Sequence, residues 1–186
     1  MKWMIASDLH GSALYTGELL ERFRQEGADR LLLLGDLLYH GPRNDLPQGY
    51  APKEVIEMLN GIAPCVFCVR GNCEAEVDQM VLEFPVLAEY CLLEWGERRV
   101  FATHGHRYHT ACPPALAPGD ILLHGHTHVP AKAPQPGGWW YLNPGSVSLP
   151  KEGSARGYMV REGKELVWKT LAGEPYDSLD LSRLEG

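Results

Sequence analysis

The sequence lacks long apolar runs and lacks the segments that direct a chain to a membrane. Apolar stretches such as 31–34 and 121–123 are far shorter than the roughly 20 residues that a membrane-spanning helix requires. The amino-terminal residues show no charged segment followed by a long apolar core and a small-residue cleavage site. The sequence therefore predicts a cytoplasmic protein that does not span a membrane.

Positive charge and paired cysteines are also scarce. The chain has 17 Lys and Arg against 24 Asp and Glu, and no basic stripe, which argues against a nucleic-acid partner because phosphate backbones bind clustered positive charge. The cysteine count is odd, and the one C-x-x-C pair, Cys65 and Cys68, lies within the apolar run 65–69. This placement favours buried thiols, while a redox pair or half of a zinc site stays open.

The 186 residues predict a single α/β domain, 1–186, large enough to fold without disulfides. Apolar runs at 2–6, 31–34 and 66–69 read as strands, and helical spacing from Leu14 to Phe23, closed by Gly27, and again over 53–59 gives β-α-β units. After residue 88 the pattern changes to short strands, predicted at 92–95, 99–103, 121–123, 139–142, 158–161 and 166–170. These predict a mostly antiparallel second sheet packed on the first. The polar tail after about residue 173 is expected to lie at the periphery.

Metal-ligand residue types stand directly after the predicted strands. They are Asp8 and His10, Asp36, Asn72, His104, and His126 with His128. Because the carboxyl ends of strands in an open α/β sheet converge on one crevice, residues far apart in sequence are expected to meet there. Six of the eight histidines fall between positions 104 and 128, which a random surface distribution does not explain.

Each of these residues has an ordinary structural alternative when taken alone. Asp8 could cap the first helix, Asn72 could occupy a left-handed turn, and a single histidine is more often a loop residue. The metal hypothesis fails only if all of these structural alternatives are true at once. The mixed oxygen and nitrogen set suits Mn, Fe, Zn or Ni. Seven donors exceed the needs of one tetrahedral zinc and match two ions about 3.5–4 Å apart that share a carboxylate.

The order of these motifs carries a family resemblance. Asp8-x-His10, Gly35-Asp36, Gly71-Asn72, His104 and Gly125-His126-Thr127-His128 resemble the signature of the calcineurin-like metallophosphoesterases, and the segments 41–44, 70–73 and 143–146 extend the likeness to small bacterial phosphodiesterases of that family. The resemblance implies a four-layer α/β/β/α sandwich with two mixed sheets and a dinuclear metal site at the strand edge. It also implies that Asp8, His10 and His128 hold one ion, that Asn72, His104 and His126 hold the other, and that Asp36 bridges them.

The chemistry that follows is hydrolysis of a small-molecule phosphodiester with two divalent ions, manganese being favoured over zinc, iron and nickel. Two cations lower the pKa of a bridging water and stabilise charge on the phosphate, so hydroxide is the expected nucleophile. No Walker-type phosphate loop is present. Two other functions stay open: a noncatalytic scaffold of the same fold, like the retromer scaffold subunit, and a phosphomonoesterase.

One departure from the family pattern concerns proton donation. Many relatives have histidine directly after the Gly-Asn pair, whereas this chain has Cys73 followed by Glu74. We therefore predict a preference for leaving groups that depart without a proton, such as those of aryl esters. The candidate catalytic residues are Asp36, Asn72 and Cys73. Arg43 and Arg70 are candidate phosphate ligands or surface ion pairs. His40, His106 and His124 are candidates for supporting the metal ligands or for replacing the missing acid, and His40 and His106 are also candidate substrate-binding residues. Homo-oligomer formation stays open.

Overall fold

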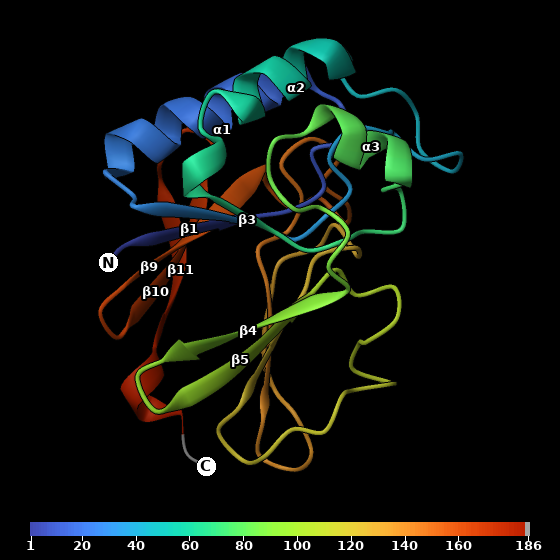
Figure 1. The fold of residues 1–186 in the computed structure, drawn as a ribbon. Coiled ribbons are helices and arrows are strands. Elements are labelled where there is room, and N and C mark those ends of the chain that lie inside the picture. The colour runs from blue at the N-terminus through green and yellow to red at the C-terminus, as the bar shows by residue number, and fades with distance from the viewer. Residues whose placement is uncertain (185–186) are drawn as a thin grey trace.

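The computed structural model describes residues 1–184, and its framework is a pair of β-sheets with helices over one outer face (Figure 1). The first sheet has the order β11-β10-β9-β1-β2-β3. Its parallel strands are β1 (Trp3–Ala6), β2 (Arg30–Leu33) and β3 (Val66–Cys68). The antiparallel strands β9 (Gly157–Glu162), β10 (Glu165–Thr170) and β11 (Pro175–Asp180) extend the sheet beyond β1.

The second sheet has the order β4-β5-β6-β8-β7. Its strands are β4 (Tyr90–Trp95), β5 (Arg98–Thr103), β6 (Ile121–Leu123), β7 (Ala131–Pro134) and β8 (Trp140–Asn143). The central strands β5, β6 and β8 are parallel, and only the edges pair antiparallel. The α/β fold with two mixed sheets is thus confirmed, while the prediction of a mostly antiparallel second sheet is wrong because β9 to β11 join the first sheet instead.

The helices lie together on one side of the sheets (Figure 1). They are α1 (Ala13–Glu26), α2 (Pro52–Asn60) and the short α3 (Glu76–Val81). Two 3-10 turns are η1 (Ala63–Cys65) and, away from these helices, η2 (Leu181–Arg183). At the start of α1 the Ser12 hydroxyl accepts a hydrogen bond from the Tyr15 amide, and the helix ends at Gly27, whose φ of 61° suits glycine. Within residues 1–184 no helix is both long and apolar enough to cross a membrane.

Alternation along β1 divides the core into layers. Met4 and Ala6 face the helices, whereas Trp3 and Ile5 face the second sheet. A third cluster, Phe101, Leu122 and Trp139, covers the outer face of the second sheet and packs against Tyr108, Leu116 and Tyr141. Within residues 1–184 no helix residue belongs to that cluster, so the segment 104–119 takes the place of the fourth, helical layer that the resemblance implied.

The described part of the tail after Gly173 packs more closely on the core than the sequence suggested. It forms edge strand β11 and then η2, and Leu181 and Leu184 enter the core between the sheets at 4% and 1% exposure. Polar residues dominate this segment because β11 is an edge strand with few buried positions. The expectation of a peripheral tail is therefore corrected for its last turn.

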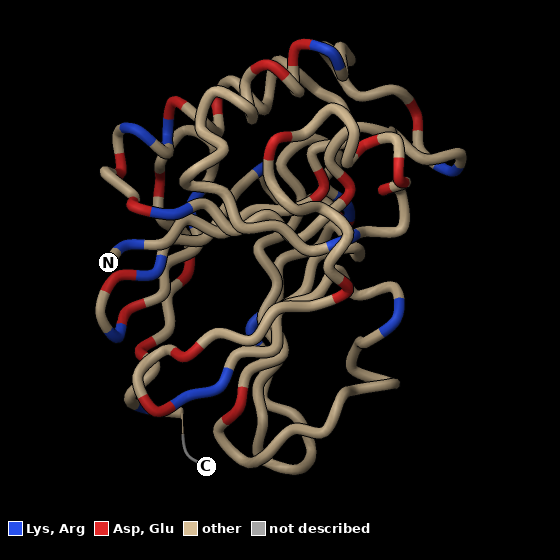
Figure 2. The backbone as a smooth tube through the Cα atoms, viewed as in Figure 1, with Lys and Arg blue, Asp and Glu red and all other residues tan. Residues whose placement is uncertain are grey.

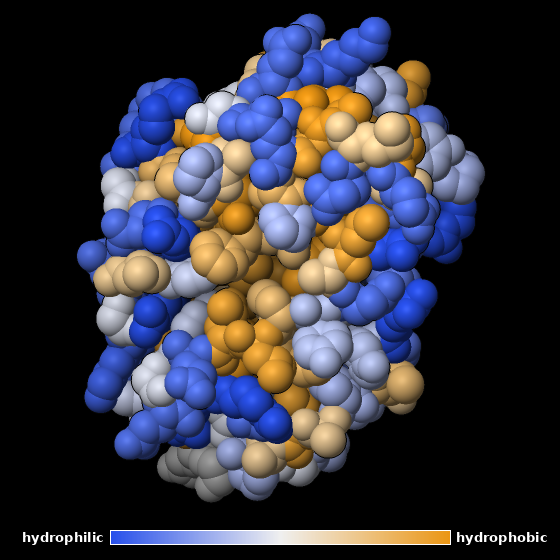
Figure 3. Space-filling view, viewed as in Figure 1, coloured by the Kyte–Doolittle hydropathy of each residue, from blue (hydrophilic) through white to orange (hydrophobic). Residues whose placement is uncertain are grey.

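One face of the molecule leaves apolar side chains in solvent. The strands β3 and β4 are each one edge of their sheet, and Phe67, Tyr90 and Leu92 on them are exposed. Figure 3 shows apolar atoms over the region where Figure 1 places these two strands. Homo-oligomer formation, left open by the sequence, stays a prediction.

Candidate active site

The loops that follow the parallel strands of both sheets meet at one edge. Asp8 and His10 follow β1, Asp36 follows β2, Asn72 follows β3, His104 follows β5, and His126 and His128 follow β6. Backbone hydrogen bonds join the first two loops, since the Asp8 amide donates to the Gly35 carbonyl at 3.1 Å and the His10 amide to the Asp36 carbonyl at 2.9 Å. Across the sheets, the His126 amide donates to Asp8 Oδ2 at 3.0 Å.

Backbone conformation marks the same residues. Among residues 1–184 the non-glycine residues with positive φ are Glu152 and five candidate ligands: Asp8 (60°), His10 (47°), Asp36 (56°), His126 (64°) and His128 (62°). This region of φ is disfavoured for side chains that carry a Cβ atom. Such strain persists where the surrounding structure holds it in place, and it concentrates at functional sites.

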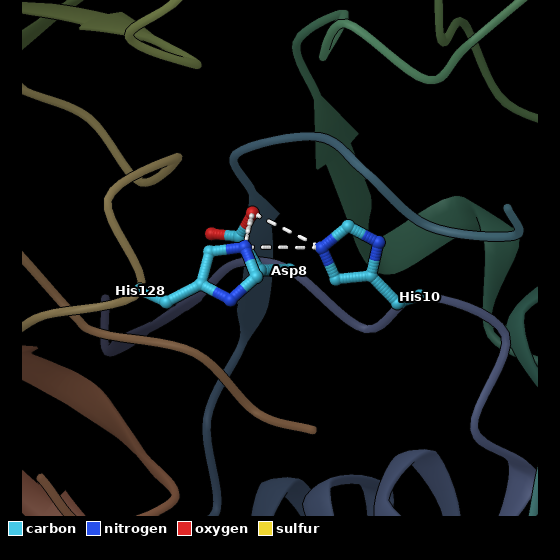
Figure 4. A group of neighbouring side chains, drawn as sticks. All are labelled: Asp8, His10 and His128. Atoms are coloured by element: carbon cyan, nitrogen blue, oxygen red, sulfur yellow. Dashed lines mark hydrogen bonds and ion pairs between the residues drawn. The ribbon is translucent and has the colours of Figure 1, made fainter. Parts of the chain in front are cut away.

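The first group of side chains is Asp8, His10 and His128 (Figure 4). Each imidazole places Nδ1 on a backbone carbonyl, His10 on Tyr39 at 2.8 Å and His128 on Leu149 at 2.6 Å. Because a carbonyl only accepts, Nδ1 carries the proton and the Nε2 lone pair of each ring points inward. The two Nε2 atoms are 3.2 Å apart and lie 3.6 and 3.3 Å from Asp8 Oδ1.

These inward atoms are all acceptors. Asp8 Oδ1 is buried and has no hydrogen-bond partner among the described residues. A buried carboxylate oxygen facing two imidazole lone pairs is costly unless a cation lies between them. The donor set of this group therefore fits a divalent metal ion.

A second group has the same character. His104 Nδ1 donates to the Leu34 carbonyl at 2.7 Å, which leaves its Nε2 as an acceptor. That atom faces Asn72 Oδ1 at 3.1 Å, His126 Nδ1 at 3.1 Å and Asp36 Oδ2 at 3.4 Å. Oxygen and imidazole donors without sulfur again suit a divalent transition metal.

Asp36 stands between the two groups. Its Oδ2 is 3.4 Å from His104 Nε2 and 3.8 Å from His10 Nε2, and its Oδ1 accepts a hydrogen bond from the Cys73 amide at 2.9 Å. The structure thus brings all seven sequence-predicted ligands to one edge, with Asp36 between the two groups.

Protonation in this site reflects burial and mutual contact. Burial raises the pKa of Asp8, but its contacts with the His10 and His128 imidazoles outweigh burial and hold that pKa well below its usual value. Burial lowers the pKa of His104, but its contact with Asp36 outweighs burial and raises it to about 9. Burial lowers the pKa of His126 to about 4. A proton on His104 therefore competes with a cation for the same carboxylate.

Glu74 is a residue of the site that sequence reasoning did not assign. Its buried carboxylate accepts backbone hydrogen bonds from Asp36 at 2.9 Å, Leu37 at 2.7 Å and Gly71 at 2.5 Å. Burial and the charge of Asp36 raise its pKa, although these three bonds act in the opposite direction. The carboxylate ties the loop after β2 to the loop after β3. Its position directly after Gly71-Asn72-Cys73 was the available signal.

A cavity of about 410 Å³ opens over these groups. Its walls contain Arg43, Cys73 and Lys151, in addition to ligand residues. Lys151 was not singled out from the sequence, because a single lysine in a loop carries no pattern. Burial, followed by the charge of Asp36, raises the pKa of the Cys73 thiol, which makes it a weak proton donor.

The remaining candidates lie outside the lining of this cavity. Arg70 donates to the Glu74 carbonyl at 3.3 and 3.2 Å and pairs with Glu89 at 3.8 Å, the ion-pair alternative left open above. His40 lies against Tyr39 and Tyr50, and His106 has its ring 5.5 Å from that of His104. His124 stacks on Tyr141 at 4.3 Å, and burial lowers its pKa to about 4.

Comparisons with known proteins agree with this geometry. A model of the calcineurin-like phosphoesterase superfamily domain matches residues 1–165. The chain is 51% identical over 158 residues to phosphodiesterase YfcE of Escherichia coli K12, a span that covers 85% of each chain. It superposes on the structure of Yfce, a phosphoesterase from E. coli, with a TM-score of 0.92, 46% identity and coverage of 97% and 100%. The zinc complex of Vps29 from Entamoeba histolytica shares the fold alone, with a TM-score of 0.61, 22% identity and coverage of 97% and 99%.

Proposed function

Since the chain belongs to the calcineurin-like phosphoesterase superfamily and is a metal-dependent phosphodiesterase by its close likeness to the E. coli enzyme, we propose a role for each of its metal-ligand residues. Asp8, His10 and His128 hold one divalent ion, Asn72, His104 and His126 hold the second, and Asp36 is shared. When bound, the two ions supply a nucleophile from water and neutralise charge on the phosphate oxygens. We propose manganese as the native ion, with zinc, iron and nickel as competitors.

The observation that carries this assignment is the set of inward lone pairs. Three imidazoles donate their Nδ1 protons to backbone carbonyls. Each therefore has an Nε2 lone pair that can bind a cation. Hydrogen bonds from ligand imidazoles to backbone carbonyls orient the metal ligands and raise their basicity. The Tyr39, Leu34 and Leu149 carbonyls therefore act as positioning groups for the site.

The wall of the cavity is proposed to hold the substrate. Arg43 and Lys151 place positive charge beside the ligand residues, which suits binding of a phosphodiester anion. Cys73 lies on the same wall, and its raised pKa makes it a poor general acid. The preference for aryl leaving groups rests on this point.

A noncatalytic scaffold is the competing function. Against it stands the cost of five strained ligand residues and of acceptors buried face to face, which a scaffold has no chemical need to maintain.

A phosphomonoesterase would differ in the shape of its substrate, and an assay with both types of ester distinguishes it from a phosphodiesterase. We retain a small-molecule substrate and a cytoplasmic location as proposals, and the net charge of −7 argues against a nucleic-acid substrate.

The test is turnover of a generic aryl phosphodiester by chelator-treated protein, with and without added Mn²⁺. We expect activity only with metal, and we expect Asp36→Asn to lower kcat by at least about 100-fold because it removes the shared ligand. Asp45→Asn, an exposed loop position, serves as the matched control. Absence of metal-dependent turnover in the parent protein would favour the scaffold, and faster turnover of an aryl phosphomonoester would reassign the substrate class.

Crystals soaked with Mn²⁺ and phosphate give an independent measurement. We expect two anomalous peaks, one beside Asp8, His10 and His128 and the other beside His104 and His126, with Asp36 between them. A single peak would contradict the shared role of Asp36.

A further inference from the structure

We propose that the segment 143–149, which runs from the end of β8 toward β9, is a positioning element of the metal site. It holds the strained backbone at Asp8 and at His126 in place, and it thereby raises the affinity of the site for both ions. The inference rests on the proposed function, because the segment supplies no metal ligand of its own. The segment carries the chain from the second sheet to the first, so it passes between the two groups of loops that present ligands.

The first residue of the segment binds the turn that carries His126. The Thr127 amide donates to the Gly125 carbonyl at 2.7 Å, and His126 between them has a φ of 64°. A three-residue turn with positive φ at its centre is rare and strained. The Asn143 side chain is fully buried, and its Nδ2 donates to the same Gly125 carbonyl at 2.9 Å. This bond fixes the peptide that precedes His126, so it opposes relaxation of the strained turn.

Neighbouring groups determine which way the Asn143 amide points. Its Oδ1 accepts a hydrogen bond from the Gly145 amide at 2.7 Å, and a backbone N–H can only donate. The NH₂ group therefore faces the turn, where it also lies 3.0 Å from Thr127 Oγ1 and 2.8 Å from the Tyr141 hydroxyl oxygen. The Asn143 backbone carbonyl accepts from the buried Trp168 indole at 2.8 Å. The backbone of this residue is thus attached to the core, while its side chain is directed at the site.

The later part of the segment binds the backbone of the other strained ligand. Asp8 has a φ of 60°, and its carbonyl accepts hydrogen bonds from Ser146 Oγ at 2.9 Å and from Ser148 Oγ at 3.1 Å. The two serines are 0% and 1% exposed. Ser146 Oγ also accepts from the Leu149 amide at 2.9 Å, and the Leu149 carbonyl accepts from His128 Nδ1 at 2.6 Å. One stretch of chain therefore fixes the peptide after Asp8 and orients the His128 ring.

These contacts act through hydrogen bonds and not through charge. The segment contains no Lys, Arg, Asp or Glu, and Figure 2 accordingly draws it in tan. A role limited to the fold does not require buried polar side chains here, since apolar side chains would fill the same space without a cost of desolvation. Strained conformations persist only where the surrounding structure over-determines them. The Asn143, Ser146 and Ser148 side chains provide that restraint at two of the strained ligands.

The experiment measures Mn²⁺ affinity by calorimetric titration of the parent, Ser148→Ala and Asn143→Ala proteins, well below the Tm of each. Ser148→Ala removes a hydroxyl that donates to the Asp8 carbonyl, and Asn143→Ala removes the donor to the Gly125 carbonyl. We expect each variant to bind Mn²⁺ about tenfold more weakly, as outer-shell substitutions do. Ser7→Ala is the matched control, because Ser7 adjoins Asp8 and is fully buried, yet its hydroxyl has no hydrogen-bond partner among the described residues.

A second readout resolves the two ions. In crystals soaked with substoichiometric Mn²⁺, we expect Ser148→Ala to lower the anomalous peak beside Asp8 relative to the peak beside His126, and Asn143→Ala to do the reverse. A general loss of stability would leave this ratio unchanged. Ser148→Ala removes a single hydroxyl, so it keeps the test available if Asn143→Ala does not fold.

The outcomes separate this inference from the proposed function. A parent protein that binds no Mn²⁺ would refute the proposed function and this inference with it. A parent that binds two ions, together with variants that keep its Mn²⁺ affinity and its peak ratio, would refute the positioning role alone. An equal loss of affinity in Ser7→Ala would also overturn it, because that variant breaks no bond to a ligand peptide.

Discussion

Substitution of Glu74 tests whether the metal site depends on a buried carboxylate that binds no metal. Glu74→Gln preserves the shape of the side chain but replaces one carboxylate oxygen with an NH₂ group. If the amide oxygen takes the place of Oε2, it keeps the bonds from the Asp36 and Gly71 amides. The NH₂ group then faces the Leu37 amide, whose bond to Oε1 is 2.7 Å in the parent protein.

The expected loss follows from that one broken bond. A buried N–H left without an acceptor costs about 1–3 kcal/mol. Part of this cost is offset, because burial and the neighbouring Asp36 disfavour the charged form and raise the pKa of Glu74. We expect a net loss of about 1–2 kcal/mol, which lowers Tm by about 2–8 °C in a chain of this size.

Metal affinity gives the readout that a general loss of stability would not move. Glu74 joins the loops that present Asp36 and Asn72, so its substitution should displace both ligands slightly. Outer-shell substitutions of this kind weaken metal binding by about 10- to 100-fold. Calorimetric titration with Mn²⁺ below the Tm of the variant measures the effect, and exposed Glu76→Gln controls for the lost charge. A Glu74→Gln protein with parental Mn²⁺ affinity would refute the positioning role.

Three other substitutions give independent checks. Cys73→His should raise kcat for diesters with alkyl leaving groups relative to aryl esters, and an unchanged ratio would show that proton donation does not set the preference. Gly17→Ala in α1, where an added Cβ meets only the Met58 methyl at 3.9 Å, should stabilise the protein by about 0.5–1 kcal/mol, a rise in Tm of about 1–4 °C. Burial raises the pKa of Glu26, but Lys169 and Tyr158 outweigh it and lower that pKa below 4.5. Its bonds therefore stabilise the fold at neutral pH and are lost as pH falls below about 4.5. The Tm difference between the parent and Glu26→Gln should accordingly shrink in acid, and a constant difference would rule out this ionic contribution.

The sequence predicted the strands that position the site because their apolar runs are buried on both faces. Residues 31–34 and 121–123 are examples, and both segments are buried. The edge strands β7 and β11 escaped prediction for the converse reason. In β7 the sequence Ala-Lys-Ala-Pro has low strand propensity, and pairing with β8 alone makes it a strand.

Which strands pair depends on contacts that are distant in sequence. The pairing of β9 with β1 joins residues more than 150 positions apart, and no local pattern specifies it. The same limit applied to the site. The strand ends located the candidate ligands, but the carbonyls of Tyr39 and Leu149 and the carboxylate of Glu74 act through loop conformation, which residue type alone does not determine.

The local backbone explains why these loops suit metal ligands. Gly71 illustrates the constraint, since a Cβ atom there would lie 2.2 Å from Asp36 Oδ1 and 2.5 Å from the Asp36 amide. Gly125 is equally restricted, because its Cβ would lie 1.9 Å from Ser7 Oγ and 2.7 Å from Asp8 Oδ2. The glycines therefore let neighbouring loops approach closely enough for a carboxylate from one to reach imidazoles from another. Five ligand residues in these loops also have positive φ, so the strained backbone and the convergence of ligands occur in the same loops.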